Sequence, residues 1–187
     1  MDQDQNRRPK AVTWVLYIAI ATVLSAGLYY LPDYFVFEKV TAASSSALLN
    51  WLGIAAVATV KDGRAFVNEF EIERMCTGVQ VIVVFVGIVL PLPHVPWKRK
   101  ITAIASVAVF VFLANIGRIA LEIIALYRGI LPWSLAHYPT GLILGIFTVA
   151  ILVTVVNVFI PEIGYYALTA IKSFFPRRRG TVSTHTP

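Results

Sequence analysis

Residues 101–127 read ITAIASVAVFVFLANIGRIALEIIALY. A helix of about 20 apolar residues crosses a hydrocarbon core of about 30 Å, so this stretch predicts a transmembrane helix. Asn115, Arg118 and Glu122 interrupt it at positions i, i+3 and i+7, which places the three on one side of the helix. A polar stripe within a bilayer must face protein or water, and ionisable residues at such positions are candidates for function.

Three other stretches have similar hydropathy, and they cover approximately 11–31, 77–93 and 138–160. The chain has 187 residues, of which 58% are hydrophobic, and its mean hydropathy of +0.74 is too apolar for a soluble domain. We therefore expect an all-α integral membrane protein with about four transmembrane helices, forming one domain over 1–187. The first stretch lacks a cleavage site of the secretory type, so we expect it to remain as an anchor.

The net charge of +6 is concentrated at the chain ends and in one loop. With four spans, all the basic clusters fall on one side of the membrane, which the positive-inside rule identifies as the cytoplasm. Both termini are then cytoplasmic, with basic tails at 1–10 and 176–187. Because the charges lie between apolar blocks, we expect a cell-membrane protein that binds no nucleic acid. The clusters are Arg7, Arg8 and Lys10; Lys98, Arg99 and Lys100; and Lys172 with Arg177, Arg178 and Arg179.

The segment 41–60 is a fifth, less apolar stretch, and counting it as a span would reverse the orientation of everything after it. Its serines at 44–46, its Asn50 and its small residues favour an amphipathic helix at the outer interface. Residues 165–175 predict a second interfacial helix after Pro161.

A short hairpin is predicted between these segments. Lys61-Asp62-Gly63-Arg64 is typical of a turn, and Phe70-Glu71-Ile72-Glu73 alternates apolar with acidic residues. Glu69, Glu71 and Glu73 share one face at a period of two, which predicts an extracytoplasmic strand leading into Cys76. A solvated loop is the alternative.

Cys76 is the only cysteine, which excludes an internal disulfide and a cysteine-based zinc site. It begins the second span at the outer face. Arg118 lies about 17 residues, or roughly 26 Å, along the outward-running third span. His137 lies in the outer loop 131–137, just before the fourth span, so all three residues converge on the outer leaflet.

Together these side chains are the types that acyl transfer through a cysteine requires. A thiol at a helix start has a lowered pKa, a histidine transfers protons near neutral pH, and an arginine stabilises the thiolate or the developing oxyanion. Each also has a simpler interpretation. The cysteine can be a small buried apolar residue, the arginine can extend to the interface, and the histidine can be an ordinary interfacial side chain.

Four segments resemble the exosortase/archaeosortase family over about 45–160. They are Leu48-Leu49-Asn50-Trp51-Leu52-Gly53-Ile54, then Ile72-Glu73-Arg74-Met75-Cys76-Thr77-Gly78, then Asn115-Ile116-Gly117-Arg118-Ile119, and finally His137. The resemblance implies a membrane-embedded cysteine transpeptidase, with Cys76 as nucleophile, Arg118 as essential arginine and His137 as third member of the site. The residues that we expect to support the site are Asn115, Thr77, Gly78 and Glu122.

The resemblance also implies the substrates and partners. Family members cleave a C-terminal sorting signal, made of a short motif, a transmembrane helix and a basic tail, from exported proteins. They then transfer the new carboxyl end to an acceptor, such as a membrane lipid. No cofactor and no metal is expected.

Two departures from the family pattern are present. The usual Cys-Ser-Gly is Cys-Thr-Gly at residues 76–78, and the chain is close to the minimal core of the family. Two rival functions are a noncatalytic membrane scaffold, in which the polar stripe holds helices together, and a small transporter, in which Arg118 binds an anion.

Overall fold

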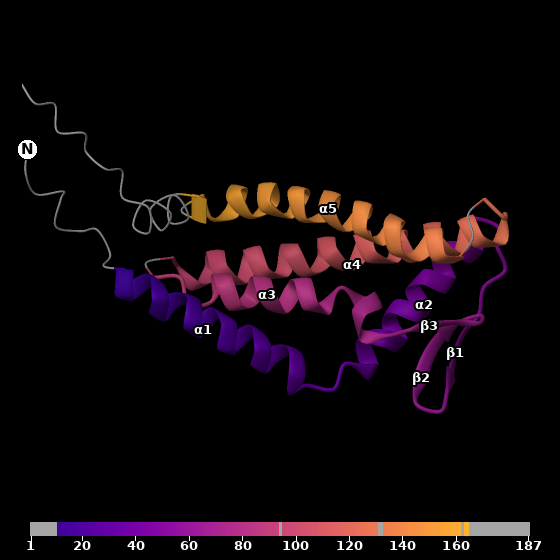
Figure 1. Ribbon diagram of the computed structural model, residues 1–187, viewed down its shortest axis with the longest axis horizontal. Coiled ribbons are helices and arrows are strands. Elements are labelled where there is room, and N and C mark those ends of the chain that lie inside the picture. Colours follow the sequence, from indigo (N-terminus) through magenta and orange to yellow (C-terminus); the bar gives the residue numbers. More distant parts are fainter. Residues whose placement is uncertain (1–10, 94, 131–132, 162, 165–187) are drawn as a thin grey trace, which may run out of the picture.

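The computed structural model describes residues 11–93, 95–130, 133–161 and 163–164. Four helices follow the long axis of the molecule (Figure 1), and α3 packs against both α1 and α4, while α4 packs against α5. A fifth helix, α2 (Phe35–Trp51), lies with a small sheet at one end. The four long-axis helices are α1 (Ala11–Tyr30), α3 (Val79–Val89), α4 (Trp97–Tyr127) and α5 (Trp133–Phe159).

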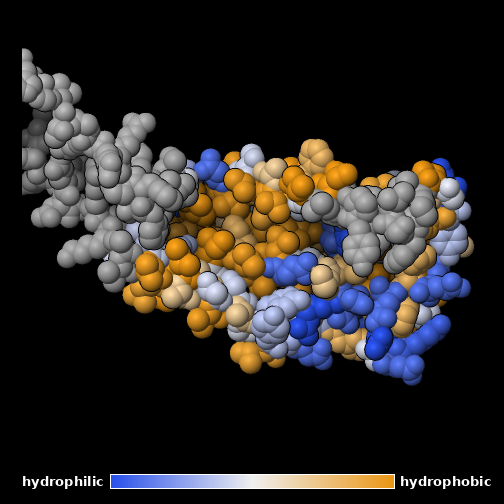
Figure 2. Space-filling view, viewed as in Figure 1, coloured by the Kyte–Doolittle hydropathy of each residue, from blue (hydrophilic) through white to orange (hydrophobic). Residues whose placement is uncertain are grey.

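The surface divides along the same axis. Figure 2 shows apolar side chains over the helices and hydrophilic ones gathered toward the end that carries the sheet. Among the described residues, Thr13–Tyr30 and Trp97–Tyr127 are long and apolar enough to cross a membrane, whereas Val79–Val89 and Gly145–Phe159 are shorter apolar helices. The described part of the chain is therefore mostly helical, with two candidate spans and two shorter apolar helices. At 1.5 Å per residue, α3 extends only about 16 Å.

Several helix ends differ from the expected ones. Helix α3 ends at Val89, just before Pro91, and α4 begins at Trp97, so Lys98 lies in a helix and not in a loop. The expectation that His137 lies in a loop is wrong, because α5 already begins at Trp133. The predicted interfacial helix 165–175 and both basic tails lie outside the described residues.

The expectation of a single helix over 41–60 is also wrong. Helix α2 starts earlier and ends at Trp51, because Gly53 takes a left-handed φ of +79° and donates to the Asn50 carbonyl, while Ile54 donates to the Leu49 carbonyl. These two bonds form a helix-ending motif that favours glycine. The side chain of Asn50 then pairs with both the N–H and the carbonyl of Ala56, at 3.0 and 2.7 Å, and directs the chain into the sheet.

The sheet confirms the predicted turn and the predicted strand before Cys76. Its three antiparallel strands lie in the order β1-β2-β3, with Lys61 opposite Arg64 and Val67 opposite Phe70. Asp62 and Gly63 both have positive φ, as a tight hairpin turn requires. The strands are β1 (Ala58–Lys61), β2 (Arg64–Val67) and β3 (Phe70–Ile72).

One hydrophobic cluster joins the sheet, α2 and the adjacent end of α4. Apolar side chains from all three elements are buried there, so the sheet packs against both α2 and α4. The next segment of the chain, which carries Cys76, is therefore held between the sheet and the helices. The buried members include Leu49, Ala65, Val67, Ile72, Ile119 and Ile123.

Candidate active site

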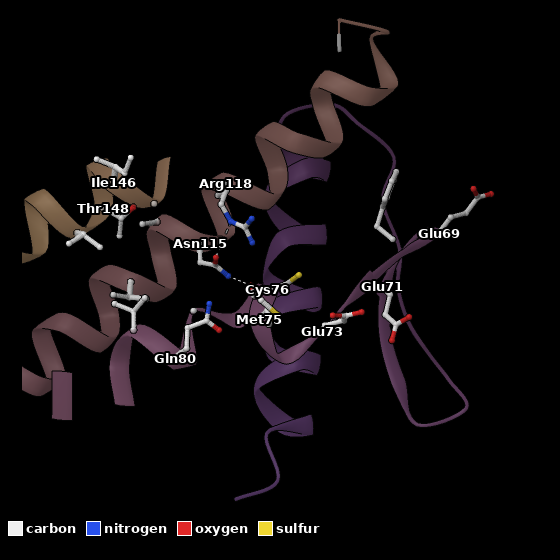
Figure 3. Close-up of a pocket in the computed structure, with 17 residues that line it drawn as sticks. Glu69, Glu71, Glu73, Met75, Cys76, Gln80, Asn115, Arg118, Ile146 and Thr148 are labelled. Atoms are coloured by element: carbon white, nitrogen blue, oxygen red, sulfur yellow. Dashed lines mark hydrogen bonds between the residues drawn. The ribbon is translucent and has the colours of Figure 1, made fainter. Parts of the chain in front are cut away.

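A cavity of about 1070 Å³ lies where β3, α3, α4 and α5 meet. Figure 3 shows Cys76 near its centre, with Arg118 and Asn115 on one side and the acidic residues of the β3 segment on the other. The cavity is large enough for several residues of an extended peptide. Its lining residues are Glu69, Phe70, Glu71, Glu73, Met75, Cys76, Gly78, Gln80, Val81, Val111, Ala114, Asn115, Arg118, Gly145, Ile146, Thr148 and Val149.

Cys76 lies in a 3-10 turn, Arg74–Thr77, immediately before α3. Its N–H donates to the Glu73 carbonyl at 2.8 Å, and the Thr77 hydroxyl donates to the Arg74 carbonyl at 2.6 Å. Arg74 donates in turn to the Tyr29 carbonyl at 3.1 Å, which ties the turn to the end of α1. The half-buried thiol is therefore carried on a segment that is hydrogen-bonded at both ends.

Gly78 joins this turn to α3 and lies close to α4. Its φ is +73°, in the left-handed region, and a Cβ at this position would lie 2.8 Å from Val111 Cγ1. Only glycine satisfies both conditions. This residue therefore sets the distance between the Cys76 turn and the helix that carries Arg118.

We expect Gly78→Ala to lower the stability of the protein more than Gly63→Ala. Both positions have a left-handed φ, which costs a residue with a Cβ roughly 1–2 kcal/mol. A Cβ at Gly78 would also overlap with Val111, whereas nothing lies within 4 Å of a Cβ at Gly63. Such overpacking typically costs about 1–3 kcal/mol more. Thermal unfolding of both variants in detergent measures the difference, and equal losses would contradict this account.

The predicted polar stripe on α4 forms a continuous chain of hydrogen bonds. The Asn115 amide donates to the Cys76 carbonyl (dashed line in Figure 3), and Arg118 Nε donates to Asn115 Oδ1 at 3.2 Å. Arg118 also forms an ion pair with Glu122 at 2.9 Å, with side chains that are only 17% and 8% exposed. The guanidinium is thus held in the cavity beside the turn that carries the thiol.

The electrostatics of the thiol differ from the expectation. Cys76 lies outside the spanning helices, and burial raises the pKa of its thiol above the ordinary value. A hydrogen bond with the Glu73 backbone and the charge of Arg118 both lower the pKa, but burial has the larger effect. The direction of this shift is opposite to the lowered pKa that was predicted for a thiol at a helix start.

The acidic residues of the β3 segment line the opposite side of the cavity. Glu71 pairs with Arg64 across the hairpin at 3.2 Å, on a partly exposed surface. Glu69 and Glu73 are exposed at the same rim. The shared face predicted from their spacing is thus a face of the cavity. Within the described ranges, no three His, Cys, Asp or Glu side chains are close enough to hold a metal ion.

His137 lies in the first turns of α5, near the end of the molecule where the sheet lies. Its side chain is outside the described residues. Further along the same helix, Gly145, Thr148 and Val149 line the cavity. The structure therefore brings together Cys76 and Arg118, and it assigns His137 to a helix that also contributes to the cavity.

Among the lining residues that were not identified from the sequence, one is polar and lies close to Cys76 in the chain. Gln80 is a polar residue in the first turn of the otherwise apolar α3, four positions after Cys76, and it lines the same cavity. A polar residue in an otherwise apolar segment that directly follows the candidate nucleophile is the signal that could have revealed it.

The sequence was also compared with known proteins. The model of the transmembrane exosortase family matches residues 6–156, a range that includes Cys76, Arg118 and His137. No curated protein and no solved structure matches the chain. The family match confirms the resemblance seen in the four sequence segments and covers more than half of the chain. The chain belongs to the transmembrane exosortase family, whose members are membrane cysteine transpeptidases that process sorting signals.

Proposed function

We propose that Cys76 is the nucleophile that cleaves the C-terminal sorting signal of exported proteins and transfers the new carboxyl end to an acceptor, such as a lipid. The observation that carries this proposal is the shared cavity of the thiol and the Arg118 guanidinium, one on the turn before α3 and the other on α4. A thiol and a guanidinium that are both partly buried in one cavity fit acyl transfer better than a packing role.

The reaction begins with removal of the thiol proton. Because burial keeps the pKa of Cys76 high, the proton leaves only when a base is within reach, and we assign this role to His137. The sulfur then bonds to the scissile carbonyl carbon, and Arg118 stabilises the oxyanion that forms. The carbon–nitrogen bond breaks, the leaving amine takes the proton from His137, and a thioester remains on Cys76.

Release requires a second nucleophile. The acceptor attacks the thioester carbonyl, its proton passes to the base, and the carbon–sulfur bond breaks to regenerate the thiol. Asn115 and Glu122 contact Arg118 from both sides and act as positioning residues in both steps.

We further propose four membrane passes, by α1, α3, α4 and α5, with the cavity at the extracytoplasmic face. The basic residues 98–100 lie at the start of α4, which Figure 1 places at the end opposite the sheet. By the positive-inside rule that end is cytoplasmic. The short α3 then completes its pass together with the residues that follow Val89.

The transporter alternative is weaker. Transport of an anion bound to Arg118 gives no role to the Cys76 thiol, which lines the same cavity. The scaffold alternative gives no reason for a cavity next to Cys76.

Capture of the thioester tests the proposal. Membranes from cells that make the protein are treated with neutral hydroxylamine, which cleaves thioesters. We expect exported proteins released from their tails to carry a C-terminal hydroxamate, detected by mass spectrometry, and we expect none from cells that make Cys76→Ser. Hydroxamates that form equally with Cys76→Ser would contradict a thioester on Cys76.

A further inference from the structure

A second hollow lies on the surface between α1 and α3. It is an apolar groove of about 550 Å³, and its α1 side extends from Tyr17 to Tyr30, which corresponds to roughly 20 Å along a helix. Thr22, Ser25 and Ala26 give α1 small side chains along this groove, while Val84 and Ile88 form the α3 side. Small residues allow a further helix to approach closely within a membrane.

Gln80 lines both this groove and the cavity that holds Cys76. Its Oε1 atom is buried and has no hydrogen-bond partner among the described residues. Buried polar atoms are nearly always paired, so an unpaired acceptor calls for an explanation. Its place at the junction of the two hollows indicates that the missing donor belongs to whatever extends from one into the other.

We propose that the groove between α1 and α3 binds the transmembrane helix of the sorting signal, and that Gln80 accepts a hydrogen bond from the first turn of that helix. The inference rests on the proposed function, and it adds where the substrate lies and which residue sets the cleavage position. The first N–H groups of any helix lack partners within the helix, so a bound helix that starts at Gln80 supplies the donor that this residue lacks.

The direction of the substrate agrees with this placement. A C-terminal sorting helix runs from the outer face inward, so its first turn lies at the outer end, where α3 also begins. Cys76 precedes Gln80 by four residues, and both line the same cavity. The scissile bond therefore lies within a few residues of the start of the substrate helix, with the preceding motif extended in the cavity.

Crosslinking from the groove tests where the substrate binds. Because Cys76 is the only cysteine, Cys76→Ser removes the native thiol and leaves uncleaved substrate in the membrane. A cysteine is then introduced by Thr22→Cys, inside the groove, or by Val23→Cys, which is adjacent, 72% exposed and outside the groove. Both variants are labelled with a benzophenone maleimide and irradiated in native membranes.

We expect position 22 to crosslink to the C-terminal apolar segment of a protein that stays uncleaved in Cys76→Ser cells. The yield of the same crosslinked product should be much lower from position 23. Equal yields from both positions, or lipid adducts alone from position 22, would overturn the groove assignment while leaving the proposed function intact. If Cys76→Ser leaves no uncleaved protein, the proposed function itself fails, and the inference fails with it.

Two substitutions of Gln80 test its hydrogen bond in the otherwise native chain. Gln80→Leu keeps the size of the side chain but removes the acceptor, whereas Gln80→Glu keeps an acceptor oxygen. With the substrate identified by crosslinking, we expect Gln80→Leu to raise KM roughly 5- to 10-fold with kcat changed less than about twofold. Gln80→Glu should leave KM close to that of the native protein. A fall in kcat alone, or equal effects of both substitutions, would contradict substrate binding through this oxygen.

Discussion

Cys76→Ser should abolish processing of sorting signals. The hydroxyl of serine ionises far less readily than a thiol, and the buried cavity disfavours its anion further, so no nucleophile remains to form the acyl intermediate. Loss of a catalytic nucleophile lowers kcat by on the order of 10⁴-fold or more. Immunoblots or mass spectrometry of the membrane fraction measure the result as accumulation of exported proteins that retain the apolar helix and basic tail.

The matched control for this substitution is Val57→Ser. Val57 is 62% exposed and lies outside the cavity, so the same new hydroxyl should leave processing unchanged there. Full processing by Cys76→Ser would rule out a thiol nucleophile and would favour the scaffold or transporter alternatives.

Arg118→Met should produce the second largest loss. The substitution removes the only cation that lines the described part of the cavity, and removal of one oxyanion-stabilising group typically lowers kcat by about 10²- to 10³-fold. It also removes the buried ion pair between Arg118 and Glu122. We therefore expect Glu122→Gln combined with Arg118→Met to recover folding but not activity.

The thiol provides a readout that is independent of substrate. Since the charge of Arg118 lowers the pKa of Cys76 and burial raises it, Arg118→Met should raise that pKa further. The thiolate fraction at a given pH then falls, so alkylation by iodoacetamide becomes slower below the pKa, and the pH profile moves to higher pH. An unchanged profile together with nearly unchanged turnover would contradict a role of Arg118 at the thiol.

The helical segments were largely predictable because they depend on local patterns. The apolar run 101–127 falls within α4, and the run 11–31 matches α1 to within a residue. The turn at 61–64 was also predictable, since Asp62 and Gly63 suit positive φ. The helix over 41–60 failed for a related reason: the hydropathy of this segment continues past Trp51, but Gly53 and the side chain of Asn50 end the helix there.

The residues of the candidate site were predictable, but their burial and the shape of the cavity around them were not. Cys76, Arg118 and Asn115 could be selected because charged and polar residues are rare in apolar segments, and their depth followed from helix rise. The sequence by itself thus determined the membrane class, the family and these candidate residues. Their contact depends on Gly78, which lets the Cys76 turn approach α4.

Only the tertiary structure showed the direction in which the pKa of Cys76 shifts and the position of Gln80 between the two hollows. The pKa of Cys76 depends on how much of the thiol is buried by elements that are distant in the sequence, and burial outweighs the nearby charge of Arg118. Gln80 gains its place because α1, α3 and α4 together form two hollows that meet at its side chain. Neither property is local, since desolvation and cavity shape arise from packing between segments that no sequence window contains.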